Sequence, residues 1–183
     1  NLNFIGYSSG FNLIETNGGL VFSVENTLNN QQILLYLTDQ GHQILATVTQ
    51  IQDYFYSNNN IYLFSNSSTT NKYLLQKIQL SDGSISTIKD QLIYVPRFSN
   101  SNHSIQYFHS EFIDQTDYLF FMGINSSGSR AAVRIKKSDG TTTNWSTLGS
   151  QSTSISTHLM MWLNTDQLFT YEYGSGKLFK LAN

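Results

Sequence analysis

The chain has 183 residues, of which 12% are charged, and a formal net charge of −2. This length suits one well-buried core and is short for two ordinary domains, and the small negative charge argues against the basic surface that nucleic-acid binding requires. Ser, Thr, Asn and Gln make up more than a third of the chain, while 12 Phe, 11 Tyr and 2 Trp supply more apolar area than a disordered chain carries. The sequence therefore predicts one folded domain over residues 1–183 with a neutral polar surface.

Cysteine is absent, which rules out disulfides and thiolate metal sites. The chain has no apolar run of transmembrane length, so we expect no membrane insertion. It begins at Asn1 without Met or a signal peptide, and we expect it to be a mature or excised segment of a longer protein. These features leave an extracellular or cell-surface location open, and we predict that location below from the polar composition.

The first predicted unit, residues 11–50, consists of short apolar runs bounded by Asn, Gly and Asp, a pattern typical of strands joined by tight turns. A strand "FNLIE" comes first, the turn "TNGG" follows, and "LVFSVENTLNNQQILLYLTDQGHQIL" then runs from Leu20 through a second turn at Asp39. Asn, Asp and Gly tolerate the positive φ of hairpin turns. The unit is therefore predicted to be a four-stranded antiparallel sheet.

The next two units, residues 52–100 and 105–150, repeat this pattern. "YLFSNSSTTNKYLLQKIQLSDGSIS" from Tyr62 aligns with "YLFFMGINSSGSRAAVRIKKSDGTTT" from Tyr118, and an apolar strand precedes each segment. Successive units are about 40 to 56 residues apart, within the range of propeller repeats. The central strands lack apolar–polar alternation, which predicts burial on both faces.

The last unit, residues 155–183, supplies only three strands, and an unassigned strand at residues 2–7 lies at the other end of the chain. The repeats resemble those of β-propeller proteins, which implies an all-β ring of about four antiparallel four-stranded blades. We expect residues 2–7 to complete the last blade. Alternatives are a larger ring continued outside this segment, a strand donated to another subunit, and a two-sheet β-sandwich.

Polar and aromatic residues provide the candidate contact sites. Sequons stand at Asn66, Asn102, Asn125 and Asn144, a number that chance alone would give, although Asn66 and Asn125 fall in the same predicted loop of two repeats. Aromatic residues beside polar ones are common in surfaces that bind sugars or proteins. We select as binding candidates Tyr54, Tyr56, Trp145, Tyr171 and Tyr173, with core packing as the competing role for most of them.

Charged residues give no clear chemical site. Arg130, Arg134, Lys136 and Lys137 form the only basic cluster, and we interpret them as solvent-facing positions of a strand hairpin in preference to a phosphate site. "SDGTTTNW" resembles the Asp-box of sialidase-like propellers, but Asp139 and Gly140 come too early in it, so we predict only a structural turn.

No metal or cofactor is predicted. His103 and His109 would be about 20 Å apart on an extended strand, too far to share a metal. His42 follows a turn glycine and His158 enters an apolar strand, and we interpret all four as surface or core histidines. Asp114 and Asp117 could offer oxygens to Ca²⁺, although turn chemistry explains both. No catalytic motif occurs, so we predict no enzyme activity.

The functional hypothesis is therefore a non-catalytic extracellular interaction or scaffold module that binds a protein partner or copies of itself and carries N-glycans. A carbohydrate-binding lectin with equivalent pockets on its blades is the first alternative. A secreted hydrolase with Glu15, Glu111 and Glu172 converging at the ring axis is the second.

Overall fold

The structure is a computed structural model that describes residues 13–26, 28–96, 112–145, 158–164, 167–172 and 177–180. All regular structure in these ranges is β-strand: β1 (Ile14–Thr16), β2 (Gly19–Asn26), β3 (Gln31–Thr38), β4 (Gly41–Val48), β5 (Ile51–Ser57), β6 (Asn60–Asn66), β7 (Tyr73–Gln79), β8 (Ile85–Leu92), β9 (Phe112–Asp114), β10 (Tyr118–Ile124), β11 (Arg130–Lys136), β12 (Thr142–Trp145), β13 (His158–Asn164), β14 (Gln167–Glu172) and β15 (Lys177–Lys180).

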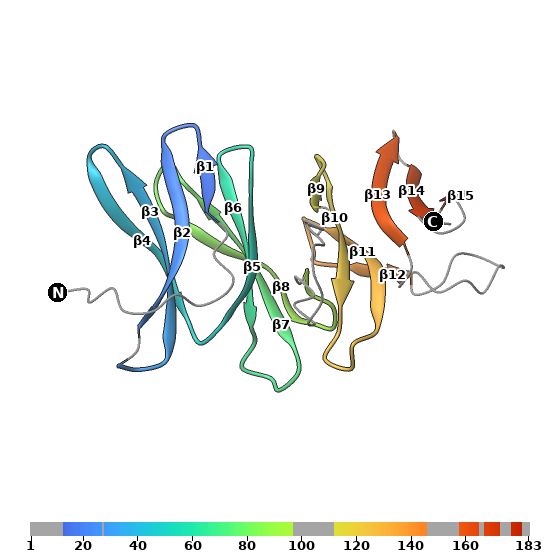
Figure 1. Cartoon of the computed structure of the whole chain (residues 1–183), viewed down its shortest axis with the longest axis horizontal. Helices are drawn as coiled ribbons and strands as arrows, with labels where there is room; N and C mark the ends of the chain where they lie inside the picture. Colours follow the sequence, from blue (N-terminus) through green and yellow to red (C-terminus); the bar gives the residue numbers. More distant parts are fainter. Residues whose placement is uncertain are drawn as a thin grey trace, which may run out of the picture. The chain divides into compact units, whose positions relative to one another are not determined.

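Consecutive strands pair antiparallel to form separate sheets (Figure 1). The first sheet is β1-β2-β3-β4, the second β5-β6-β7-β8 and the third β9-β10-β11-β12, while β13-β14-β15 form a three-stranded sheet. The predicted all-β class is confirmed, and three sheets have the four-stranded antiparallel form of propeller blades. Residues 2–7 lie outside the described part of the chain. That part contains no helix able to span a membrane.

The chain divides into two compact units, Asn1–Leu92 and Ile93–Asn183. In the first unit, an apolar cluster holds the first and second sheets together through Val21, Leu34, Leu45, Ala46, Tyr54, Ile61, Leu63, Ile78 and Leu80. In the second unit, Val95 forms an isolated bridge with Ile124 at the end of β10. The segment after β8 therefore joins the third sheet, although the predicted repeat unit 52–100 included it with the second.

Central strands are buried on both faces. In β6 every residue from Ile61 to Ser65 is buried, and in β10 Leu119, Phe120 and Phe121 are buried in succession. Because neighbouring residues of a strand point to opposite faces, such runs require apolar cover on both sides of the sheet. The predicted loss of alternation in these strands is confirmed.

The two Ser-Asp-Gly turns have the same hydrogen bonds. The Asp82 carboxylate accepts from the Ser84 N–H at 2.9 Å, and Asp139 accepts from the Thr141 N–H at 2.8 Å. The glycines that follow adopt positive φ, +72° at Gly83 and +68° at Gly140. A residue with a side chain would be strained in this backbone conformation. Hydrogen bonding lowers the pKa of both carboxylates: at Asp82 chiefly from the Ser84 backbone N–H, and at Asp139 chiefly from the Thr141 side chain and then from its backbone N–H. "SDGT" is thus a structural turn, as predicted.

The strand pairing corrects the alignment of the repeats by two residues. Lys136 pairs with Tyr118, and the matching residue before the other turn, Gln79, pairs with Asn60. Tyr118 therefore corresponds to Asn60, whereas the sequence alignment matched it with Tyr62. A shift of two residues leaves every side chain on the same face, which is why the pattern of apolar residues did not reveal it.

Ser65 carries a buried hydroxyl in β6 that has no hydrogen-bond partner among the described residues. A buried unpaired hydroxyl costs free energy, and an alanine would fill almost the same space. We expect Ser65→Ala to raise the free energy of unfolding by about 1 kcal/mol, measured by urea denaturation. Ser81→Ala, at an exposed turn position, is the control. A destabilised Ser65→Ala protein would contradict this account of the hydroxyl.

Candidate functional site

One face of the third sheet gathers two aromatic rings around an arginine. Alternation along β10, β11 and β12 places Tyr118, Arg134 and Trp145 on the same face of the sheet. The Arg134 guanidinium carbon lies 5.2 Å from the centre of the Tyr118 ring and 5.5 Å from that of Trp145. Both distances fall within the range of cation–π attraction. We call these three residues the Arg134 cluster.

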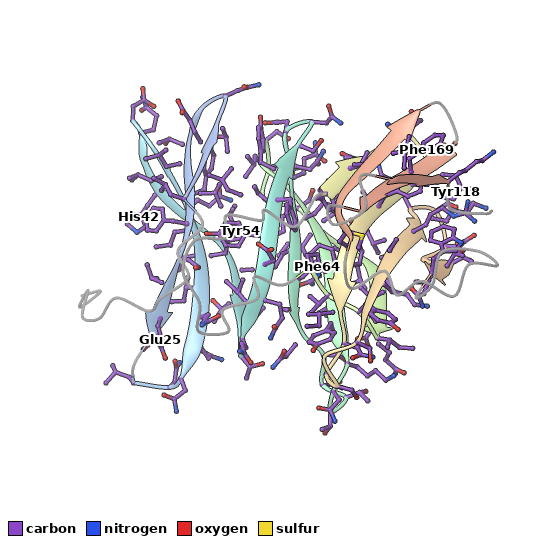
Figure 2. All side chains as sticks on the ribbon, turned by 45° about the vertical axis from the view of Figure 1, so that its right-hand side comes forward. Glu25, His42, Tyr54, Phe64, Tyr118 and Phe169 are labelled. Carbon is purple, nitrogen blue, oxygen red and sulfur yellow. The ribbon has the colours of Figure 1, made fainter. Side chains whose placement is uncertain are left out.

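Neighbouring side chains hold the Arg134 cluster in place. Arg134 Nη2 donates to Thr143 Oγ1 at 3.3 Å, and the Tyr118 ring packs against Phe120 with the ring centres 6.2 Å apart. Phe120 is buried, whereas the three cluster residues are half-buried. The guanidinium is therefore fixed in direction and partly desolvated, yet it can still be reached from solvent. Figure 2 labels Tyr118 in the third sheet.

Arg134 differs from the lysines that follow it. Lys136 pairs with Asp139 at 3.3 Å, and Lys137 pairs with Asp114. Among the side chains that the structure describes, no carboxylate lies within ion-pair distance of Arg134. Two residues of the basic cluster of the sequence, Lys136 and Lys137, thus pair with local acids. Arg134 does not pair with any described carboxylate, and the Arg130 side chain lies outside the description.

The ion pair between Lys137 and Asp114 occupies two positions that carry core-packing residues in the second sheet. Strand pairing matches Lys137 with Leu80 and Asp114 with Tyr56, and these two belong to or pack against the apolar cluster. The Asp114 side chain is only 3% exposed and that of Lys137 24%. Asp114 is therefore engaged by an ammonium group, which argues against the calcium-binding alternative considered for it. The described residues contain no group of three or more His, Asp or Glu that could hold a metal.

The Arg134 cluster is not repeated in the second sheet. At the positions of Tyr118, Arg134 and Trp145 the second sheet carries Asn60, Lys77 and Lys89. Neither ring is present there. A site with equivalent pockets on successive blades, as the lectin alternative expects, therefore receives no support from this comparison.

The aromatic candidates fall into different environments. Trp145 belongs to the Arg134 cluster. Tyr54 is 2% exposed and lies between the first and second sheets (Figure 2), and Tyr56 packs against the same apolar cluster. Tyr54 is thus a core residue, and its selection as a binding residue was wrong because burial removes it from any ligand. Tyr171 lies on β14, where its side chain is outside the description, and Tyr173 lies outside the described residues.

Burial raises the pKa of the Tyr54 phenol to about 12, because phenolate would lose its hydration there. Hydrogen bonding to Ser23 lowers the pKa, and the nearby Asp53 raises it further. A pKa raised by folding gives stability that is fully present below the unfolded value of about 10 and is lost as the pH rises toward 12. We expect Tyr54→Phe to flatten the decline of the urea midpoint between these pH values. An equally steep decline in the variant would contradict this assignment.

The sequons differ in their surroundings. Asn66 is the last residue of β6. Its side-chain amide donates a hydrogen bond to Gln50 at 3.0 Å and accepts one from Gln52 at 2.8 Å. The Asn125 side chain accepts from two backbone N–H groups of its own turn. Asn144 is exposed on β12, and Asn102 lies outside the described residues. Asn144 is therefore the most accessible described acceptor.

The remaining candidates are dispersed. His42 is exposed on β4, His158 begins β13, and His103 and His109 lie outside the described residues. Glu15 is exposed on β1, Glu172 lies on β14 and Glu111 is outside the description. Tyr118 and Arg134 were not chosen from the sequence as binding residues, because only the strand register brings them beside Trp145.

Comparison with solved structures supports the fold. TolB from Acinetobacter baumannii, whose C-terminal domain is a β-propeller, matches with a TM-score of 0.51 and 12% identity, over 91% of this chain and 42% of that one. The protein lmo1340 from Listeria monocytogenes EGD-e matches with a TM-score of 0.49 and 12% identity, over 92% of this chain and 53% of that one. The chain thus spans about half the length of these proteins or less.

At such identities the similarity concerns the fold alone. No family model matches the chain, and no curated protein does so. The three blade-like sheets and the likeness to TolB together support a propeller-type architecture.

Proposed function

We propose that this chain is a non-catalytic interaction module of the β-propeller type, which binds a protein partner or copies of itself at the cell surface or outside the cell. The observation that carries the proposal is the Arg134 cluster. Tyr, Trp and Arg are the residues most enriched at the energetic centres of protein interfaces. Here they are held together, half-buried and open to solvent on one face of a sheet.

The cluster suits a protein partner better than a sugar. Both rings contact the guanidinium, so their attraction is already directed to Arg134. A partner can still bind the N–H donors at the edge of the guanidinium, and their planar, paired arrangement matches the two oxygens of a carboxylate. The cluster also occurs in only one of the two sheets compared, which fits a single contact better than repeated lectin pockets.

We also propose that the ring closes through residues 2–7, which would add a fourth strand to β13-β15. The support is that the other three sheets have four strands each, whereas this sheet has three in its described part. Pairing would cover an exposed strand edge. A larger ring and a strand donated to another subunit are the alternatives. Deleting residues 1–10 should lower stability if closure is internal, and an unchanged urea midpoint would exclude that mode.

The proposal of an extracellular location with N-glycans rests on composition. Few charges, many neutral polar side chains and an exposed acceptor at Asn144 suit a secreted surface. The test is intact mass with light scattering on native material, before and after glycosidase treatment. A glycosylated assembly larger than 20.7 kDa supports the proposal. A bare monomer that binds no protein contradicts it.

A further inference from the structure

The acidic residues near the N-terminus have no basic neighbours in sequence. No Lys or Arg precedes Lys72, so the first sheet contains acids without any Lys or Arg. Three of these acids are exposed, Glu15 on β1, Glu25 on β2 and Asp39 in the turn after β3. No ion pair involves them among the described residues. The first sheet therefore presents uncompensated negative charge.

Two of these acids lie beside exposed apolar surface. Strand pairing places Glu15 opposite Leu20 and Leu20 opposite Leu37, so the three share one face of the first sheet. Leu37 is 41% exposed, and Asp39 follows it in the turn that closes β3. We call Glu15, Leu37 and Asp39 the acidic edge. It combines carboxylates with an apolar contact.

The Arg134 cluster has the complementary composition. Its guanidinium belongs to a half-buried residue, has no carboxylate partner among the described side chains, and is flanked by two rings that offer apolar area. A desolvated arginine gains most from a bidentate carboxylate, and the rings gain from covering an apolar side chain. The acidic edge thus offers carboxylates and an apolar side chain, and the Arg134 cluster offers the cation and the apolar rings that could bind them.

We propose that the Arg134 cluster binds the acidic edge of a second copy of this chain. The proposal rests on the proposed interaction function and names its partner. Charge complementarity within one sequence makes the copy itself the best-matched partner, because among the described side chains Arg134 on the third sheet and the acids on the first sheet have no ion-pair partners. Attraction between opposite charges at the surface is screened by salt, so the association should weaken as ionic strength rises.

The test uses two charge-reversed variants in sedimentation velocity. Arg134→Glu removes the cation of the Arg134 cluster and keeps the acidic edge. The double variant Glu15→Arg with Asp39→Arg removes the acids of that edge and keeps the Arg134 cluster. Each variant alone should associate at least about tenfold more weakly than the unchanged chain. An equimolar mixture should recover a complex, because one intact pair of surfaces remains between unlike copies. Raising NaCl from about 50 to about 500 mM should weaken the unchanged assembly.

Lys77→Glu is the matched control, because Lys77 occupies the position of Arg134 in the second sheet. It should leave association unchanged. Arg134→Gln, which removes the charge without reversing it, provides a second variant if Arg134→Glu fails to fold, and circular dichroism checks each protein.

Three results would overturn the proposal: a monomer at about 200 µM, association that survives both reversals, or a mixture that does not recover. If native material assembles with a different protein while the purified chain stays monomeric, the self-association proposed here is wrong, but the proposed interaction function still stands. If native material binds nothing, the proposed function fails as well.

Discussion

Replacing Asp114 with Asn should destabilise the second unit by about 3 kcal/mol. The Asp114 side chain is almost fully buried against Lys137, and the substitution leaves a mostly buried ammonium without the negative charge that faces it. Breaking one side of such a pair costs more than the pair contributes, because the remaining charge stays desolvated. Urea denaturation at neutral pH measures the change.

The second sheet supplies the control for this prediction. It carries Tyr56 and Leu80 at the positions of Asp114 and Lys137. The double variant Asp114→Tyr with Lys137→Leu should therefore recover most of the stability that Asp114→Asn loses, since apolar replacements of buried pairs are often neutral. Lys136→Met, which breaks the exposed pair with Asp139, should leave the urea midpoint nearly unchanged, because solvent screens the attraction between exposed charges. A small loss in Asp114→Asn would show that water compensates the ammonium.

Alanine at either Leu63 or Phe64 should cost about 3 to 5 kcal/mol of unfolding free energy. The two residues are adjacent in β6 and fully buried, so their side chains point to opposite faces of the second sheet. Leu63 belongs to the cluster shared with the first sheet, and Phe64 meets Phe55 edge to face with ring centres 6.1 Å apart. Each truncation would leave a cavity in a packed interior.

The comparison of the two variants tests the architecture as well as the packing. In a two-sheet sandwich one face of each sheet meets solvent, so only one of two adjacent residues would be costly. A blade has neighbours on both faces, so both should be costly. Leu28→Ala, at a turn residue that is 95% exposed, is the control and should change stability by less than about 0.5 kcal/mol. A large loss at Leu63 alone would favour the sandwich.

Much of the strand arrangement could be predicted because it depends on local signals. The turns at Asp82 and Asp139 were identified from Ser-Asp-Gly, and the hydrogen bonds of these turns are formed within a few residues. Burial on both faces of β6 was readable from the unbroken run at "IYLF". Such features need no knowledge of distant parts of the chain.

The candidate site was less predictable because it depends on register. Trp145 was selected, but Tyr118 and Arg134 meet it only through the pairing of three strands. Tyr54 and Trp145 each follow polar residues in the sequence and were both selected, yet one is in the core and the other is half-buried. Local composition cannot distinguish the two faces of a strand when both carry apolar residues.

The consecutive pairing of strands has a consequence for how the protein is made. Each sheet takes its strands from one continuous segment, with hairpins between neighbours, so its ladder forms between residues close in sequence. Contacts of this kind lower contact order and favour rapid folding. The first sheet is complete once Val48 has left the ribosome, and its cluster with the second sheet needs nothing beyond Leu80. We therefore expect the N-terminal sheets to acquire structure during translation, before the Arg134 cluster has been synthesised.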